Sequence, residues 1–308
     1  MVNGVELDTI YNMDCIEGMK MLPDKSIDMI LCDLPYGTTA CKWDSIIPFD
    51  DLWAAYKRII KDNGAIVLFG SEPFTSTLIQ SQIKLFRYDL IWDKEKGCDF
   101  LNANRKPLKS HENLIVFYKK SPTYNKQYWY SKPYKKITGN KKQSSIYHDA
   151  HDAESESIDG KRNPLSIIHF PRDGNRVHPT QKPVALCEYL IKTYTNEGEV
   201  VLDNCFGSGT TLVAAVNTNR HYIGFELEPK YFDIACNRLD DAERERERER
   251  TIIFLIIDVK GGEVMVFWNI LAGLLCFFGG FAACIGVIWL ITNVIEKVSE
   301  YDEYDYYD

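Results

Sequence analysis

Short apolar runs alternate with helical patterns along most of this chain, and this alternation limits its possible folds more than any other feature. The pattern covers residues 1 to about 118 and resumes at residue 183. The predicted strands are Leu7–Tyr11, Ile27–Cys32, Ala65–Phe69, Tyr88–Trp92, Leu114–Tyr118, Val200–Asp203 and Tyr222–Glu226. The predicted helices are Asp50–Lys61, Pro73–Gln82, Pro183–Tyr194, Thr210–Asn217 and Pro229–Leu239. Such alternation predicts an α/β fold in which helices cover a doubly wound, mostly parallel sheet.

A polar motif follows the second predicted strand directly. The residues Asp33-Leu34-Pro35-Tyr36 come after the apolar run Met29–Cys32. In open α/β sheets, ligands bind at the carboxyl ends of the strands. A carboxylate, a carbonyl held extended by the following proline and an aromatic ring suit a flat heterocycle that carries an amino group. An ordinary turn is the alternative interpretation of four such residues.

A second motif lies where the strand Val200–Asp203 passes into a helix. Two glycines, Gly207 and Gly209, follow the strand and precede Thr210. Glycine lets a ligand approach the backbone, and the first N–H groups of a helix favour an anion. The third glycine of a dinucleotide site is absent, and an acid, Glu226, ends the next strand 19 residues after Gly207, where it could accept ribose hydroxyls. S-adenosylmethionine, a nucleoside with a small charged head, fits this pattern, whereas a purely structural turn is the alternative.

A third element, residues 178–183, precedes the predicted helix Pro183–Tyr194. Thr180 could cap this helix, and Lys182 could meet a carboxylate. Taken alone, the element indicates a helix start.

Charge and cysteine content narrow the possible functions. A net charge of −8 argues against a protein that binds polyanions over its whole surface, so a nucleic-acid contact needs a local basic patch. Residues 119–142 supply one, because their lysines alternate with aromatics and no acid occurs among them. The acidic stretch Asp149–Gly160 that follows predicts a mobile loop. The nine cysteines lack the paired spacing of a zinc or disulfide site, so we expect no metal. Residues 1–10 lack the basic region and the apolar core of a secretory signal, so we expect a cytoplasmic main body.

The chain changes character after residue 242. Residues 243–263 form a Glu/Arg-rich linker, which begins with strict Glu-Arg alternation. Residues 264–295 are apolar enough for a transmembrane helix that would tether the cytoplasmic domain, and residues 296–308 form an acidic tail. Because a GA dinucleotide tract can encode such a repeat and is prone to slippage, one hypothesis is that a frame change fused a neighbouring reading frame here.

The order of these motifs resembles that of a known family. The sequence Asp33-Leu34-Pro35-Tyr36, the basic-aromatic insert, residues 178–183 and the loop Asp203–Thr210 follow one another as in the β group of amino-DNA methyltransferases. These enzymes are circularly permuted relatives of the S-adenosylmethionine-dependent fold. The stretches 62–69 and 110–118 are also similar, so the resemblance spans about residues 5–240. The chain departs from the family pattern at two positions. The family usually has proline where this chain has Leu34. It usually has an aromatic residue two positions after the loop aspartate, where this chain has Cys205 followed by Phe206.

The resemblance implies a seven-stranded, Rossmann-like methyltransferase sheet in a domain of residues 1–242, with a target-recognition insert at about residues 119–175. It places Asp33, Leu34, Pro35 and Tyr36 at the target base. The implied cofactor residues are Asp14, Thr180, Lys182, Asp203, Phe206, Gly207, Ser208, Gly209, Thr210 and Glu226. The implied DNA-binding residues are Lys119, Lys120, Lys126, Tyr128, Trp129, Lys132, Lys135 and Lys136.

The function expected from this resemblance is site-specific transfer of a methyl group from S-adenosylmethionine to the exocyclic amino group of a flipped adenine. Asp at position 33 favours adenine within the family. The alternatives are methylation of the cytosine N4 amino group and a membrane-anchored DNA-binding protein with an inactive methyltransferase fold. The expected partner is double-stranded DNA. A cognate restriction endonuclease, a second copy of the chain and a membrane are further candidate partners.

Overall fold

A computed structural model describes residues 6–37, 44–98, 100–137, 154–174, 177 and 180–260. By its internal contacts the chain divides into two compact units, Met1–Ala242 and Glu243–Asp308. His178, Pro179, Lys141, Lys142, residues 264–295 and the acidic tail lie outside the described residues.

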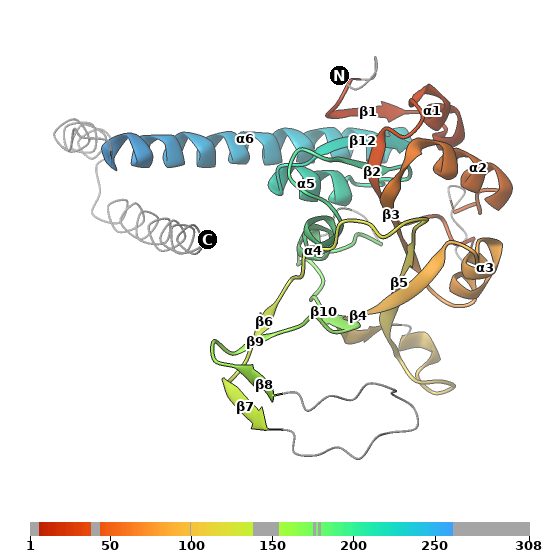
Figure 1. Ribbon diagram of the computed structural model, residues 1–308. Coiled ribbons are helices and arrows are strands. Elements are labelled where there is room, and N and C mark those ends of the chain that lie inside the picture. The colour runs from red at the N-terminus through yellow and green to blue at the C-terminus, as the bar shows by residue number, and fades with distance from the viewer. Residues whose placement is uncertain are drawn as a thin grey trace. The chain divides into compact units, whose positions relative to one another are not determined.

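The first unit is built on an eight-stranded sheet with the order β1-β12-β11-β2-β3-β5-β4-β10 (Figure 1). The strands, in that order, are Thr9–Asn12, His221–Glu226, Val200–Asp203, Ile27–Cys32, Ile60–Gly70, Lys109–Phe117, Phe86–Cys98 and Ile167–His169. All neighbours pair in parallel except β5, which is antiparallel to both β3 and β4. The mainly parallel α/β sheet is confirmed, although the sheet has one strand more than expected.

Helices cover both faces of this sheet and create two apolar cores. The helices α1 (Cys15–Met21), α2 (Phe49–Ile59) and α3 (Phe74–Ser81) pack on one face, whereas α4 (Val184–Tyr194), α5 (Thr210–Asn217) and α6 (Pro229–Lys260) pack on the other. Alternate side chains of β2 pack into the two cores. Met29 and Leu31 belong to the core under α4 and α5, and Ile30 and Cys32 belong to the core under α1 and α2. A run that is buried throughout is typical of a central parallel strand.

Two helix predictions need correction. The helix α1 was not predicted, although Asp14 caps it by accepting hydrogen bonds from the N–H groups of Ile16 (2.9 Å) and Glu17 (3.1 Å). Thr180 does not cap α4, because that helix begins at Val184 with Pro183 at the N-cap. The carboxylate of Asp173 accepts the hydrogen bond from the Val184 N–H instead (3.4 Å).

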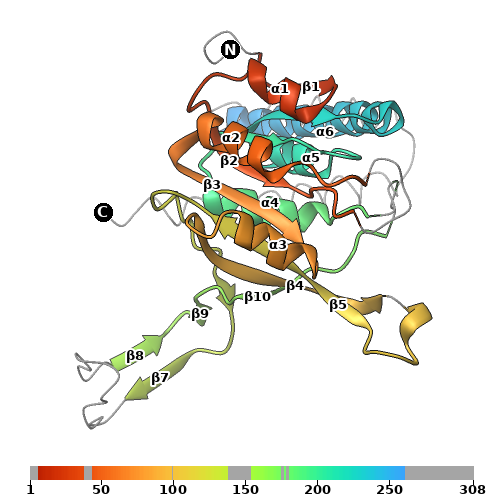
Figure 2. The same cartoon turned by 90° about the vertical axis from the view of Figure 1, so that its right-hand side faces the viewer.

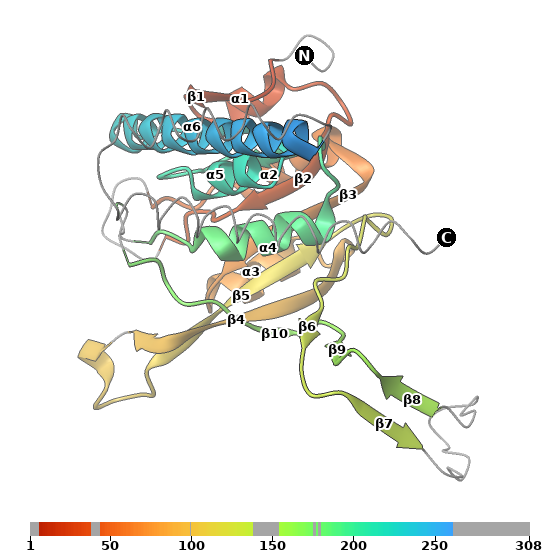
Figure 3. The same cartoon turned by 90° about the vertical axis from the view of Figure 1, so that its left-hand side faces the viewer.

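Strand direction divides the molecule into two edges. The strands β2, β11, β12 and β4 all end at one edge, the carboxyl edge, whereas the antiparallel β5 ends beside the start of β4, with Phe117 opposite Phe86. The chain therefore enters the insert at the opposite, amino edge. Two small arms follow there, β6 (Trp129–Tyr130) with β9 (Lys161–Arg162) and β7 (Tyr134–Ile137) with β8 (Glu154–Ser157). Figure 2 and Figure 3 show the β7–β8 arm and the tip of the β4–β5 hairpin extending to opposite sides.

Part of the predicted mobile loop is a strand. Residues 154–157 form β8, and the register places Lys135 opposite Glu156. Positions of opposite charge across two strands favour such pairing. The insert also ends in a strand of the main sheet, since β10 pairs with β4.

The second unit is described only for residues 243–260, which are helical. Its ion pair between Arg248 and Glu245, three residues apart, measures 3.4 Å. Among the described helices, none is long and apolar enough to cross a membrane. The predicted transmembrane segment lies outside these residues and stays a prediction.

Candidate active site

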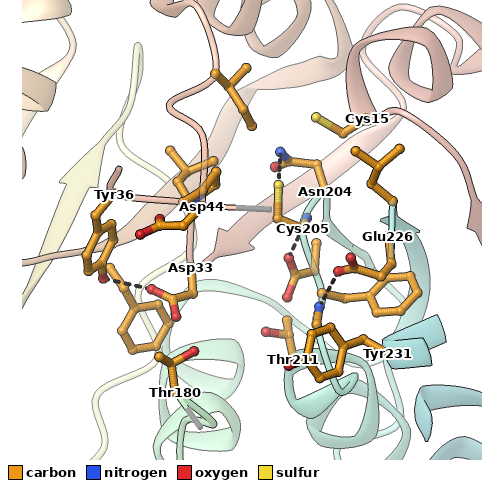
Figure 4. Close-up of a pocket in the computed structure, with 18 of the residues that line it drawn as sticks. Cys15, Asp33, Tyr36, Asp44, Thr180, Asn204, Cys205, Thr211, Glu226 and Tyr231 are labelled. Atoms are coloured by element: carbon orange, nitrogen blue, oxygen red, sulfur yellow. Dashed lines mark hydrogen bonds between the residues drawn. The ribbon is translucent and has the colours of Figure 1, made fainter. Parts of the chain in front are cut away.

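The two motifs singled out in the sequence line one cavity at the carboxyl edge of the sheet. This cavity has a volume of about 540 Å³ and lies at the ends of β2, β11 and β12, beside the first residues of α1 and α5. Asp33 and Tyr36 form one wall, and Asn204, Cys205 and Glu226 form the other (Figure 4). The pocket therefore has two halves, each carried by a different strand-to-loop junction.

Both carboxylate oxygens of Asp33 already have partners. The Tyr36 hydroxyl donates to Oδ1 (2.7 Å), and the Lys182 ammonium donates to Oδ2 (2.5 Å). The Tyr36 ring stacks on Phe74, with 4.8 Å between centroids, so a base can stack only on its other face. The next residue, Leu34, is buried and lines the cavity together with Pro35. The motif is thus held in place by its own tyrosine and by a lysine distant in sequence.

A buried charge cluster surrounds Asp33. Lys182 also lies 3.2 Å from Glu112, which forms a second ion pair with Lys94. Two ammonium groups thus face two carboxylates. Burial raises the pKa of Asp33 in spite of Lys182, whereas the two lysines outweigh burial and lower the pKa of Glu112. Burial alone would lower the pKa of Lys182, but the two carboxylates raise it. Lys182 is therefore a permanent cation beside the proposed base-binding acid.

Lys182 has protein partners in addition to its place at the cavity. The resemblance implies that it is a cofactor residue, and it lines the cavity with its ammonium paired to two protein carboxylates. Glu112 and Lys94 had no assigned role. The only signal for Glu112 was its place in the family-like stretch Ser110–Tyr118, and the sequence gives no sign of its contact with Lys182.

The glycine loop forms the other half of the pocket. Gly207 and Gly209 adopt positive φ angles of 53° and 79°, and a Cβ at Gly209 would lie 2.9 Å from Ala235. Asp203 is buried and accepts a hydrogen bond from the Cys205 N–H (3.1 Å). Burial raises the pKa of Asp203 to about 7. The loop thus combines a close backbone turn with a buried acid.

A helix far along the chain fixes this loop. The guanidinium of Arg238, on α6, donates to the Ser208 carbonyl (2.6 Å), the Ser208 hydroxyl (3.0 Å) and the Thr210 hydroxyl (3.1 Å). Three hydrogen bonds from one guanidinium therefore hold the loop at Ser208 and Thr210, while the N–H groups of Gly207 and Gly209 donate to other groups of the protein. Arg238 was missed in the sequence, where it looks like any arginine of an exposed helix.

The acid at the end of β12 completes the nucleoside side. Glu226 accepts hydrogen bonds from the N–H groups of Gly207 (2.8 Å) and Glu228 (2.9 Å). Burial raises its pKa in spite of these bonds. Asp14 and Phe206 also line the cavity, and the Phe206 ring packs 6.3 Å from that of Phe232. Apart from Gly209, the residues assigned to the cofactor all line this cavity. A cavity with a glycine turn and buried acids fits a nucleoside with a charged head.

The lysines at the start of the insert differ from expectation. Lys119 and Lys120 each lie 3.3 Å from the carboxylate of Asp62, at the beginning of β3. Together with Lys25, these two lysines lower the pKa of Asp62 to about 2. Residues 119–142 contain no acid, but the fold brings Asp62 beside the first two of their lysines. These two lysines are therefore paired at the amino edge, away from the cavity.

Aromatic residues of the insert also interact with groups of the protein itself, through cation–π contacts and a hydrogen bond. Lys161 lies over the Tyr128 ring at 4.2 Å, with Lys126 at 5.9 Å, and Arg162 lies over Tyr134 at 4.4 Å. The Trp129 indole donates to the Asn163 carbonyl (2.9 Å). Lys132 and Lys135 are exposed, and the side chain of Lys136 lies outside the described part of the chain. The DNA contacts assigned to these residues remain proposals.

Comparison with known proteins agrees with this geometry. The model of a DNA methylase family, N6_N4_Mtase, matches residues 27–237. The chain belongs to this family. It is also 30% identical over 265 residues to the type II methyltransferase M.HinfI of Haemophilus influenzae, covering 76% of this chain and 68% of that protein. The protein is therefore a DNA methyltransferase of the N6/N4 family that uses S-adenosylmethionine.

The fold is similar to that of two methyltransferases of known structure. The M1.HpyAVI–SAM complex is 26% identical, with a TM-score of 0.51, and the match covers 75% of this chain and 98% of that one. The cytosine-N4-specific PvuII DNA methyltransferase is 16% identical, with a TM-score of 0.56, and the match covers 79% and 93%. The second likeness shows the shared fold alone.

Proposed function

We propose that this DNA methyltransferase acts on the exocyclic amino group of adenine in double-stranded DNA, at a specific site. The observation that carries the proposal is the meeting of Asp33 and the Asp203–Thr210 loop in one cavity. Asp33 presents a carboxylate next to the Leu34 carbonyl, two acceptors for the two N–H bonds of an amino group. An aspartate at this position favours adenine over cytosine.

The chemical task of Asp33 follows from its charge. An exocyclic amine is a poor nucleophile because its lone pair is delocalised into the ring. Hydrogen bonds to Asp33 and to the Leu34 carbonyl favour a tetrahedral nitrogen, whose lone pair is then available. The nitrogen loses its proton as the new bond forms, and Asp33 can accept it or pass it to water. The free face of Tyr36 would stack on a base that has left the duplex.

The second half of the pocket would hold the cofactor, which supplies an electrophilic sulfonium methyl group when bound. The glycine loop and Asp203 would hold the methionine part, and Thr180 lies at the same cavity. The carboxylate of Glu226 would accept ribose hydroxyls, and Asp14 would lie near the adenine. Holding nitrogen, carbon and sulfur in line supplies much of the rate gain in such reactions.

The test is methyl transfer from labelled S-adenosylmethionine to unmethylated genomic DNA, followed by separation of the nucleosides. We expect the label in N6-methyladenine. Label in N4-methylcytosine would instead show that the protein methylates the cytosine amino group. No incorporation, together with retained DNA binding, would favour the inactive binding protein.

The other proposed partners depend on parts of the chain outside the pocket. Residues 264–295 would tether the protein to a membrane if they are expressed with the domain, and fractionation of cells that carry the full-length gene tests this. A restriction endonuclease of the same specificity and a homodimer are the remaining proposals for partners.

A further inference from the structure

The hairpin formed by β4 and β5 ends in an exposed apolar tip. Its last strand pair is Cys98 with Lys109, and the chain between them includes the short 3₁₀ helix Phe100–Asn102. Phe100 is 76% exposed and Leu101 is 84% exposed. Two adjacent large apolar side chains on a projecting turn are costly in water unless a partner covers them.

The tip lies at the edge of the sheet from which DNA would reach Asp33. Since β4 runs parallel to β2, its end extends past the edge at which Asp33 lies. A base can reach Asp33 only if its duplex lies against this edge. The arms of the insert start from the opposite edge (Figure 3). The tip of the β4–β5 hairpin is therefore better placed than those arms to contact DNA beside the target base.

Charge favours DNA as the occupant. In sequence, the turn from 96 to 109 has four basic residues and one acidic residue, namely Lys96, Arg105, Lys106 and Lys109 against Asp99. Lys96 and Arg105 are exposed. An apolar wedge flanked by cations is the combination that proteins use to insert between base steps while holding the phosphates.

The stem of the same hairpin reaches the active site. Lys94, on β4, is ion-paired with Glu112, on β5, and Glu112 lies 3.2 Å from Lys182, the partner of Asp33. Close to the tip, the Arg172 guanidinium donates to the Cys98 thiol, and Arg172 lines the cavity. Movement of the tip against DNA would thus act directly on the groups that surround Asp33.

We propose that Phe100 and Leu101 form a wedge that enters the DNA stack beside the target base and stabilises its flipped state, while Lys96 and Arg105 contact the phosphates. This inference rests on the proposed function, because it takes duplex DNA as the substrate. The wedge contributes when the base must leave a paired stack, and contributes little when its partner base is already missing.

The kinetic test uses the full-length double variant F100A/L101A. Its substrates are a duplex carrying the site that the wild-type protein methylates, and the same duplex with an abasic position opposite the target base. We expect kcat/KM to fall about tenfold or more on the paired duplex and to stay within about twofold of wild type on the abasic one. The matched control is Ile83→Ala, because Ile83 is 55% exposed and lies between α3 and β4 at the amino edge. Equal losses on both duplexes, or none, would overturn the wedge.

A second measurement does not depend on activity. The photo-reactive amino acid p-benzoylphenylalanine at position 100 should cross-link to plasmid DNA, whereas the same group at position 83 should not. If position 100 cross-links only to another copy of the chain, the tip is a dimer contact and the proposal is wrong. Cross-linking without methylation by the wild-type protein would reject the proposed function and leave the DNA contact standing.

Discussion

At the scale of single residues, Asp33, the acid proposed to bind the target base, lies inside a buried cluster of four charges. Asp33 shares Lys182 with Glu112, and Glu112 shares Lys94 in turn. The cluster is neutral as a whole, which makes the burial of its members tolerable. Its members come from the residue after β2, from β4, from β5 and from the segment before α4. The charge on Asp33 is therefore set by residues from four separate parts of the chain.

Replacement of Lys182 by methionine tests this cluster. Two carboxylates would then face each other with one cation fewer, so we expect the free energy of unfolding at pH 8 to fall by about 3–5 kcal/mol. The pKa of Asp33, already raised by burial, would rise further. The stability deficit should therefore shrink as the pH falls, and the acidic limb of the methylation rate should move to higher pH. Denaturant titrations and pH–rate profiles measure these effects, and Lys182→Arg should restore most of both. Unchanged profiles would contradict the account.

A second residue prediction concerns Asp203. Because burial raises its pKa to about 7, its carboxylate loses its charge as the pH falls through that value. If the charged form holds the cofactor's ammonium group, affinity for S-adenosylmethionine should fall about tenfold from pH 8 to pH 6. Calorimetric titration at the two pH values measures the change. Asp203→Asn should bind weakly at both, and a variant that keeps the wild-type pH dependence would show that another group is responsible.

The residues at the ends of strands could be predicted from the sequence. The pairs of residues that only the fold brings into contact could not. Asp33, Asp203 and Glu226 each follow an apolar run, so their common edge could be predicted from strand order alone. Glu112, Arg238 and Asp62 act through contacts 18 or more positions away along the chain. No local pattern marks such contacts, since an ionic residue in a strand or helix usually faces solvent.

At the scale of elements, α6 supports the glycine loop. Its Arg238 makes three hydrogen bonds to Ser208 and Thr210, and its Ala235 leaves room for no side chain at Gly209. The helix thereby holds a turn with two positive φ angles.

Arg238→Met should loosen this turn without removing any group expected to contact the cofactor. We expect the Kd for S-adenosylmethionine to rise about tenfold or more, since hydrogen bonds from a charged group contribute roughly 1.5–3 kcal/mol. Arg248→Met is the matched control on the same helix, because the Arg248 side chain is 74% exposed. An equal effect of the two substitutions would indicate a general loss of helix stability, and no effect of Arg238→Met would remove its assigned role.

Most elements were predictable because their apolar periodicity is strong. The strands Ile27–Cys32 and Val200–Asp203 and the helix Thr210–Asn217 have the predicted bounds. The direction of β5 was not predictable, because a strand buried on both faces has the same pattern whether it runs parallel or antiparallel. That single reversal moves the basic insert to the amino edge.

At the scale of the whole molecule, the carboxyl and amino edges of the sheet carry different features. The carboxyl edge carries the pocket and the exposed tip of the β4–β5 hairpin, whereas the amino edge carries the paired lysines and the arms of the insert. All residues assigned to the pocket fall in the first compact unit, Met1–Ala242. The Glu-Arg run and everything after it belong to the second unit.

A chain that stops after Ala242 should therefore retain the activity. We expect its affinity for S-adenosylmethionine and its rate of DNA methylation to stay within about twofold of the full-length protein, because the boundary follows the last contacts of α6 with the core. Calorimetry and methyl incorporation measure both quantities. A truncated chain that folds but no longer binds the cofactor would place part of the site beyond residue 242.

Asp33 and the glycine loop together form the proposed adenine methyltransferase site. This proposal is tested by sequencing that detects modified bases, applied to DNA from cells that express the full-length protein. We expect N6-methyladenine at one sequence motif, and its loss in cells that express Asp33→Ala at an equal level. Modified DNA in the Asp33→Ala cells, or only N4-methylcytosine in the wild-type cells, would contradict it.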